Sequence, residues 1–232
     1  MKLTIPAFVG RIAFSALAAL IGAAFALPLL WFFFAPFNAR AELGLALPDP
    51  WTLSNFVTVF GNSYAVQALW NSFIQAVGGV ILVGAAATLA AYALSRSSIP
   101  GKGAVTYILL LFSSVVSGSA AMVPIFLIIS AAGLMDTHIA VILTFAGGLL
   151  PTAMFILRDF IDSIPKSYEE SAMVAGASPV QAFFDVALPV IRPGIVVVVV
   201  WAFVNIWGSF LIPFILLRSD SNMPASVAIY SF

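Results

Sequence analysis

The chain has 232 residues, of which 62% are hydrophobic and 8% are charged, and its formal net charge is zero. Soluble domains carry about 25% charged residues, so this composition is typical of a membrane protein. Zero net charge argues against nucleic acid as a partner, and the lack of cysteine excludes disulfides and thiolate metal sites. With a single histidine, His138, a multi-histidine metal site is excluded, and we expect this residue at an interface or in a loop.

The first long apolar stretch covers residues 12–34 and is predicted to cross the membrane. Basic residues precede it, and the small residues around Arg40 resemble a signal-peptide cleavage site. However, the stretch is longer than the roughly 7–15 apolar residues of a signal peptide and reaches the about 20 needed to span a bilayer. We therefore expect a retained membrane anchor.

Four further stretches satisfy the same length requirement, so five spans are predicted in one transmembrane domain over residues 1–232. They cover residues 73–95, 104–129, 139–157 and 194–217. A more polar loop, with a short surface helix at residues 55–60, separates the first span from the second.

The third and fourth spans contain residues that are unusual inside a membrane helix. The third is rich in serine and glycine around Ser117 and contains Pro124, so we expect tight helix packing or a lining role there. The fourth is predicted to be interrupted by Gly147-Gly148 and Pro151.

Basic residues flank the spans unevenly, which predicts the orientation of the chain. With a cytoplasmic N-terminus, seven of the nine basic residues lie inside and only Arg40 and Arg218 lie outside. The seven are Lys2, Arg11, Arg96, Lys102, Arg158, Lys166 and Arg192. This bias places the loop at residues 158–193 in the cytoplasm.

Capping signals in this loop predict two short helices joined by a turn. Ser167 and Glu170 have the spacing of one capping box, and Gly176 offers a left-handed stop. Ser178 and Gln181 have the spacing of a second box, with Pro179 at the first helical position. Pro189 and Pro193 are expected to end the second helix. Ala172 and Gly176 lie four residues apart and give the first helix a face of small residues.

The spacing Glu-x-Ala, three residues, Gly, nine residues, Val-x-Leu-Pro from Glu170 to Pro189 resembles the EAA loop of ABC importer permeases. Ser171 and Val186 depart from that pattern by small or isosteric changes. In that family the loop inserts into a cleft of the ATPase. The resemblance implies that the ATPase-coupling residues here are Glu169, Glu170, Ala172, Gly176, Ala177, Leu188 and Pro189.

Other segments resemble the carbohydrate branch, in particular the maltose-type second permease. They are residues 71–72, 91–96, 100–102, 123–124, 133–137, 188–189 and 193–194. Ala175 replaces a frequent Asp, and Trp207-Gly208-Ser209-Phe210 stands where the family often has Trp-Asn-Glu-Phe. The implied fold is the all-α, polytopic transmembrane domain of a type I ABC importer, with five spans visible. The family's sixth span is not found in the sequence. Either the chain is incomplete, which is the alternative we favour, or the span was lost.

The resemblance implies one of two permease subunits in a bacterial plasma (inner) membrane importer for a sugar or sugar-like solute. The implied partners are a second permease, an ABC ATPase dimer that uses ATP and Mg, and an extracytoplasmic substrate-binding protein. The chain itself is expected to bind no cofactor or metal and to catalyse no reaction. Polar and aromatic residues deep in the spans are candidates for the substrate pathway. They are Asn205, Trp207, Ser209 and Ser117.

Other functions stay open. The solute could be a glycerophosphodiester, a polyol phosphate or a peptide, or the chain could be a non-catalytic structural membrane subunit. An intramembrane hydrolase needs histidine or paired carboxylates within the membrane, and an ion-coupled carrier needs acidic residues there. All nine acidic residues fall in loops or at the ends of the predicted spans, which argues against both.

Overall fold

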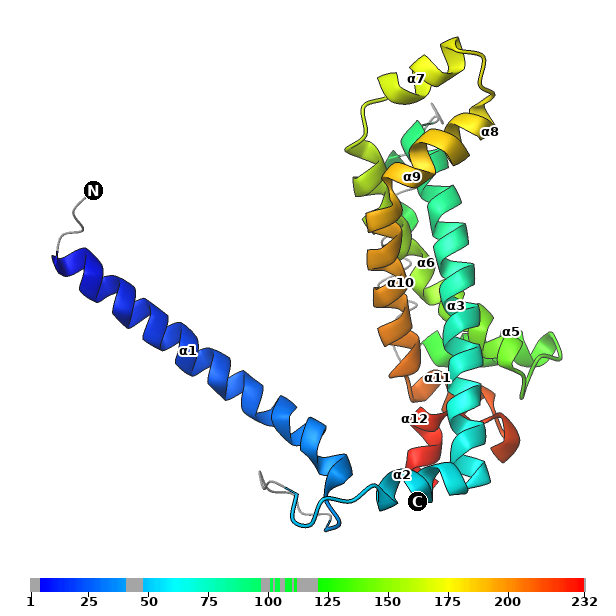
Figure 1. The fold of residues 1–232 in the computed structure, drawn as a ribbon. Coiled ribbons are helices and arrows are strands. Elements are labelled where there is room, and N and C mark those ends of the chain that lie inside the picture. Colours follow the sequence, from blue (N-terminus) through cyan, green and yellow to red (C-terminus); the bar gives the residue numbers. More distant parts are fainter. Residues whose placement is uncertain are drawn as a thin grey trace. The chain divides into compact units, whose positions relative to one another are not determined.

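The computed structural model describes residues 5–40, 48–96 and 121–231, together with some residues between 101 and 111. In these ranges the secondary structure is helical, apart from an isolated β-bridge between Asn38 and Trp51 (Figure 1). Where the sequence predicted one domain, the chain divides into two compact units, Met1–Val66 and Gln67–Phe232.

The first unit contains the N-terminal apolar helix and a polar turn. Helix α1 (Ile5–Phe34) covers the predicted span at residues 12–34 and runs into η1 (Ala35–Phe37). Helix α2 (Ser54–Gly61) is the short helix expected at residues 55–60. The side-chain amide of Asn55 donates to the carbonyl oxygens of Pro36 and Asn38 at 3.0 and 2.9 Å, which fastens α2 to the turn.

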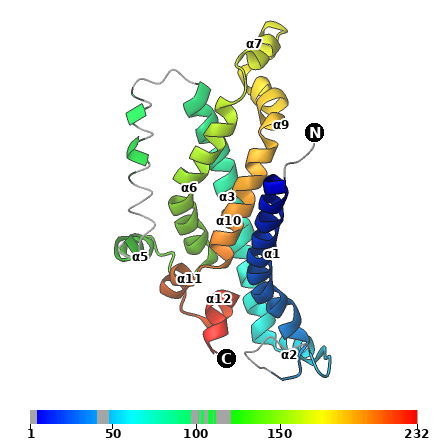
Figure 2. The ribbon, with the colours of Figure 1, turned by 90° about the vertical axis from the view of Figure 1, so that its left-hand side faces the viewer.

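Three long helices lie side by side in the second unit (Figure 2). They are α3 (Ser63–Arg96), α6 (His138–Asp162) and α10 (Arg192–Trp207). Helices α3 and α6 cover the predicted spans at residues 73–95 and 139–157. Both are longer than predicted, and α3 begins ten residues before residue 73 because Ser63 to Ser72 continue the same helix.

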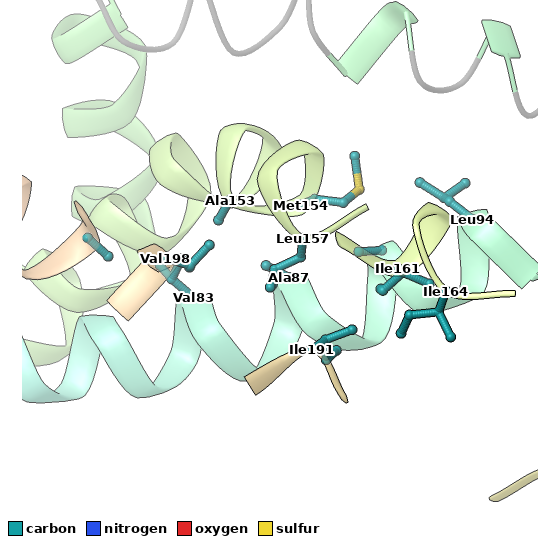
Figure 3. Packing of buried hydrophobic residues seen from close by; sticks show 12 residues of the cluster. Val83, Ala87, Leu94, Ala153, Met154, Leu157, Ile161, Ile164, Ile191 and Val198 are labelled. Carbon is teal, nitrogen blue, oxygen red and sulfur yellow. The ribbon is translucent and has the colours of Figure 1, made fainter. Parts of the chain in front are cut away.

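Buried alanine, valine, leucine and isoleucine residues fill the space between these helices (Figure 3). Val83 and Ala87 of α3, Leu157 of α6 and Val198 of α10 are wholly buried and belong to one cluster. Two of the four buried residues that α3 contributes to this cluster are alanines, and small residues allow close helix packing in membranes.

Helix α6 is continuous through Gly147, Gly148 and Pro151, so the predicted interruption of the fourth span is wrong. A broken helix in the hydrocarbon would leave several backbone groups without partners, whereas one proline removes a single donor. Continuing the helix is therefore the less costly solution. Gly148 lies on the lining of a cavity described below.

Only the end of the predicted third span lies among the described residues. Helix α5 (Met122–Ala131) extends two residues beyond the predicted limit at residue 129. Pro124 is the third residue of α5, where its missing N–H has no helical partner to lose. Residues 112–120, including the candidate pathway residue Ser117, lie outside the described residues.

The predicted fifth span at residues 194–217 is not one helix. Helix α10 ends at Trp207, and the N–H of Ser209 donates to the carbonyl oxygen of Ile206 at 3.2 Å. This bond spans three residues and tightens the chain where the helix ends. The chain continues in short helices: α11 (Leu211–Leu216), η4 (Asp220–Asn222), α12 (Ala225–Ala228) and η5 (Ile229–Ser231).

Within the described residues, three helical segments are long and apolar enough to cross a membrane by themselves: Ala13–Phe37, Ser63–Arg96 and His138–Asp162. The pair Pro179–Val190 and Arg192–Trp207, bent by 71°, makes a fourth if it counts as one span. The loop helices α7, α8 and α9 lie at one end of the second unit and α12 lies at the other (Figure 1).

Candidate functional site

The loop predicted to couple to an ATPase begins with helix α7 (Ser167–Val174), which starts differently from the sequence expectation. Its N-cap is Lys166, no side chain caps it, and the capping box of Ser167 with Glu170 is not formed. The N–H of Tyr168 donates to Pro165 and that of Glu170 donates to Lys166, so helical turns begin before Ser167. A residue already inside the helix cannot serve as its N-cap.

The end of α7 is a Schellman turn at Gly176, as the sequence predicted. The N–H of Gly176 donates to Met173 and that of Ala177 donates to Ala172, both at 3.0 Å. Gly176 has φ +99°, a region that side chains disfavour, and no atom lies within 4 Å of where its Cβ would stand. The glycine thus serves the turn and leaves its outer surface open.

The second loop helix comprises α8 (Pro179–Gln181), η3 (Ala182–Ala187) and α9 (Leu188–Val190). It opens with the predicted capping box: the N–H of Ser178 donates to Gln181 Oε1 at 2.8 Å and that of Gln181 donates to Ser178 Oγ at 3.3 Å.

Pro189 does not end this helix, contrary to the sequence expectation. Segment η3 is π-helical, and the N–H of Leu188 donates to Phe183, five residues earlier. The ring of a proline collides with the carbonyl of the fourth preceding residue in an ordinary α-helix, and a widened turn before Pro189 relieves that crowding. The helix ends at Val190, and Pro193 occupies the first turn of α10 after the 71° bend.

The two adjacent glutamates of α7 lie in opposite environments. Glu169 is buried, and Arg96 Nε of α3 donates to its Oε1 at 2.7 Å. The hydroxyl of Tyr92, one turn earlier on α3, donates to Glu169 Oε2 at 2.7 Å. Glu169 is therefore bound within the chain and does not lie on the outer face where the resemblance placed it. Removing one partner of such a buried pair costs about 3–5 kcal/mol.

The remaining coupling candidates lie on or near the surface of the loop. Glu170 and Gly176 are exposed, and Val174 between them is 90% exposed. The half-buried candidates are Ala172, Ala177, Leu188 and Pro189. The loop thus presents a mixed acidic and apolar surface next to a left-handed turn.

A cavity of about 310 Å³ lies among α5, α6, α10 and α11. Two of the predicted pathway residues, Asn205 and Ser209, line it. The structure adds Trp201, Thr144 and Thr152, which the sequence analysis did not select. The other lining residues are Met122, Ile125, Phe145, Gly148, Leu149, Leu211 and Ile212. Among the described residues, this lining has an indole, hydroxyls and an amide but no ionisable side chain, which suits an uncharged polar solute.

Trp207 does not line this cavity, although the sequence analysis grouped it with Asn205 and Ser209. Its ring stacks on Phe203 at 5.3 Å between centroids, and 37% of the residue is exposed. On a helix, residues 201, 205 and 209 are spaced by four and share a face, whereas 207 does not. That spacing was the signal in the sequence that could have selected Trp201.

At the opposite end of the second unit, Asp136 joins the α5–α6 turn to the segment before η4. Its Oδ1 accepts from the N–H groups of Arg218 and Ser219 at 2.9 and 3.0 Å, and its Oδ2 accepts from the Ser219 hydroxyl. The amide of Asn222 donates to the Asp136 backbone oxygen at 2.8 Å. These hydrogen bonds, of which the one from the backbone N–H of Arg218 has the largest effect, hold the pKa of Asp136 well below its usual range.

Polar side chains of α3 hold the next part of the same segment. The amide of Asn71 donates to the carbonyl oxygens of Ser221 and Met223 at 2.8 and 3.0 Å. The hydroxyl of Ser72 accepts from the N–H of Ala225 at 2.8 Å. His138 contacts the amide of Gln75, with 3.2 Å between His138 Nδ1 and Gln75 Nε2.

Residues 98–231 match the family described as binding-protein-dependent transport system inner membrane component, and this region is more than half of the chain. The chain belongs to this family. As a member, it is a multi-pass membrane subunit of a transport system, and the family is not one of catalytic subunits.

Relatives of this inner membrane component include transport permeases for saccharides. The chain is 32% identical over 198 residues to the diacetylchitobiose uptake system permease protein of Streptomyces coelicolor, covering 84% of this chain and 65% of that protein. It is 34% identical to an inner membrane ABC transporter permease protein of Escherichia coli, over 79% of this chain and 66% of that protein. It is 31% identical to the trehalose transport system permease protein of Mycobacterium tuberculosis, over 89% of this chain and 76% of that protein. The chain spans just under two thirds of the length of the first two relatives.

The fold agrees with that of ABC importer permeases. A crystal structure of a bacterial ABC transporter involved in the import of the acidic polysaccharide alginate matches with a TM-score of 0.85 at 21% identity. The match covers 100% of this chain and 82% of the other. The all-α, polytopic fold of a type I ABC importer predicted from the sequence is therefore confirmed.

Proposed function

We propose that this inner membrane component forms part of the solute pathway of an ATP-driven importer and is coupled to its ATPase through residues 158–193. The importer contains a second permease, an ABC ATPase dimer that hydrolyses ATP with Mg, and an extracytoplasmic substrate-binding protein. The N-terminus and the loop lie in the cytoplasm. The chain contributes no catalytic group, and its role is to convert closure of the ATPase into a change of access to the pathway.

The geometry of the coupling loop carries this proposal. Two short helices, fixed by a Schellman turn at Gly176 and a capping box at Ser178, project from one end of the helix bundle. The turn leaves Glu170 and Val174 exposed, while Glu169 holds the first helix to α3. A rigid projection with an acidic and apolar surface is suited to docking into a cleft of a moving partner.

A neutral saccharide is the solute class that the cavity supports. Trp201 offers an aromatic face for a sugar ring, and Thr144, Thr152 and Asn205 offer hydrogen-bonding groups. The named solutes of the relatives include diacetylchitobiose, trehalose and maltodextrin, which also supports a sugar. The relatives also include a permease for sulfoquinovosyl glycerol, which is acidic, but none of the described residues that line the cavity here is cationic.

Purification of the tagged chain from its native membrane tests the assembly. We expect a nucleotide-hydrolysing subunit and a second permease to co-purify, and the reconstituted assembly to take up a neutral saccharide with ATP. Competition with a polyol phosphate and with a peptide separates the alternative solutes. A chain that purifies without a nucleotide-hydrolysing partner would be a structural subunit, and the proposal would be wrong.

The side of the membrane is tested by labelling, because the chain has no cysteine of its own. Val174→Cys on the loop is expected to react with a membrane-impermeant maleimide only from the cytoplasmic side. Labelling from outside in intact cells contradicts the orientation.

The coupling role is tested at Gly176, where a side chain meets open space in the chain itself. Gly176→Leu is expected to reduce uptake at least tenfold while the protein remains folded, because the bulk falls on the partner's surface. Gly176→Asn is the matched control, since asparagine tolerates a left-handed backbone best. Wild-type uptake in Gly176→Leu excludes this turn from the ATPase interface.

A further inference from the structure

We infer that Arg96, Tyr92 and Glu169 form the joint through which the coupling loop moves helix α3, an inference that rests on the proposed function. Their role is distinct from docking, because Glu169 is buried within the chain and Arg96 and Tyr92 belong to the membrane helix. The three residues are positioning residues: they touch neither the solute nor the nucleotide.

The contacts of Arg96 connect α3 to both sides of the loop's entry. Its Nε donates to Glu169 of α7, and its Nη2 donates at 3.1 Å to the carbonyl oxygen of Ile164, which lies between α6 and α7. Beside it, the hydroxyl of Ser95 donates to Asp162 at the end of α6. The last turn of α3 is therefore bonded to α6, to the connecting segment and to α7.

The second loop helix is held by the same turn of α3. The ring of Tyr92 packs on Phe183 of η3, with 4.7 Å between ring centroids, while its hydroxyl bonds to Glu169. Tyr92 and Arg96 lie four residues apart, so one face of α3 reaches both helices of the loop. A displacement of either loop helix thus acts on α3.

Burial makes this connection stiff. The side chains of Arg96 and Glu169 are 12% and 6% exposed, so little water screens their attraction. In such a setting, separating the charges is opposed much more strongly than at an exposed site.

The test uses the complete importer, reconstituted with its ATPase and binding protein, and a variant that removes both charges. Arg96→Met with Glu169→Met leaves no unpaired buried charge, so we expect it to fold and to retain the ATPase. Uptake is expected to fall at least tenfold while ATP hydrolysis continues. Asp220→Asn, an exposed carboxylate of η4 at the opposite end of the second unit, is the control and is expected to keep wild-type uptake.

A distance measurement separates force transmission from a merely structural role. Spin labels at Tyr168→Cys on α7 and Leu89→Cys on α3 occupy exposed positions, and the chain has no other cysteine. In the otherwise wild-type importer, we expect the label distance to stay constant when an ATP analogue binds, because α7 and α3 move together. In the double methionine variant we expect the distance to change.

Several results overturn the inference. They are a label distance in the wild-type importer that changes with nucleotide, a double variant with wild-type uptake, and a double variant that loses the ATPase, which would make the pair a docking element.

Tyr92→Phe provides a second variant, because it deletes one hydroxyl and keeps the ring on Phe183. We expect a two- to fivefold loss of uptake there, and full wild-type uptake excludes Tyr92 from the joint. A wild-type assembly without an ATPase contradicts the proposed function instead.

Discussion

At the scale of single residues, adjacent and chemically identical side chains have different tasks. Glu169 and Glu170 follow each other in the first turn of α7, where negative charge is favoured by the helix dipole. Of the two, only Glu169 forms an ion pair among the residues that the structure describes, because Arg96 lies opposite it on α3. Glu170 remains exposed and available to a partner. Sequence alone gave both residues the same role, because their local contexts are nearly equivalent.

Substitutions of two tryptophans of α10 are expected to affect the KM for solute uptake differently. If the cavity is the pathway, Trp201→Ala removes an aromatic face worth about 1.5 kcal/mol and raises the KM for uptake about tenfold. Trp207→Ala is then expected to leave the KM unchanged, since Trp207 stacks on Phe203 outside the cavity lining. Uptake kinetics of the two variants decide, and a changed KM in Trp207→Ala alone supports the assignment made from the sequence.

Asp136 predicts a pH dependence at the end of the bundle opposite the coupling loop. Its pKa in the folded protein is lowered, so its contribution to stability is present above the unfolded pKa of about 3.9. That contribution is lost as the pH falls toward the folded pKa. We therefore expect the segment at residues 218–222 to loosen progressively below about pH 5.

Hydrogen exchange of residues 218–222 from pH 7 down to about pH 2.5, which is below the unfolded pKa, measures this effect after correction for intrinsic exchange rates. Asp136→Asn is expected to exchange faster at neutral pH and to lose most of the pH dependence. Equal protection of this segment in both proteins at both pH values is the contrary result.

At the scale of elements, the coupling loop shows that the spacing of a capping motif alone does not determine whether the capping box forms. The backbone conformation at the N-cap residue decides. Ser178 with Gln181 forms the predicted capping box, because Ser178 has an extended backbone with φ −69° and ψ 158°. Ser167 with Glu170 has similar spacing but forms none, since the chain is already helical at Lys166, with φ −59° and ψ −26°. The side chain can cap only where the backbone opens.

Alanine variants of the two serines test this difference. Ser178→Ala is expected to destabilise the second loop helix by about 1 kcal/mol, which increases hydrogen exchange of residues 181–183 several-fold. Ser167→Ala is the matched control and is expected to leave the exchange of α7 almost unchanged. Equal effects of the two substitutions contradict the assignment of the caps.

At the scale of the whole second unit, glycines set how closely the long helices pack. A Cβ at Gly194 of α10 would lie 2.6 Å from the ring of Phe160 on α6, which cannot move without its own backbone. A Cβ at Gly79 of α3 would lie 2.5 Å from Cδ1 of Ile206 on α10, but this atom is the end of a flexible side chain. Close packing of this kind stabilises helix contacts in membranes, where the hydrophobic effect does not.

Gly194→Ala is therefore expected to destabilise the bundle by about 1–3 kcal/mol through overpacking. Gly147→Ala is the control, because no atom lies within 4 Å of its added Cβ, and alanine favours the helix by up to about 1 kcal/mol. The midpoint of thermal unfolding in detergent compares the two. A midpoint that is unchanged in Gly194→Ala, or lowered equally in both, contradicts this packing.

Local and compositional features of the sequence determined the membrane class, the positions of α1, α3 and α6, and the Schellman turn. They also determined the capping box of the second loop helix and the resemblance to the importer family. Each depends on residues a few positions apart, because apolar length and caps act within one segment. The burial of Glu169 and the break after Trp207 were decided by the tertiary structure.

The tertiary structure also decided the cavity, since its lining comes from α5, α6, α10, Ser209 and α11. The reason is physical: these features depend on residues up to about 90 positions apart, and no local pattern specifies which side chains meet across helices. Arg96 and Glu169 are ordinary charged residues in the sequence, and only the packing of α7 against α3 makes them a pair.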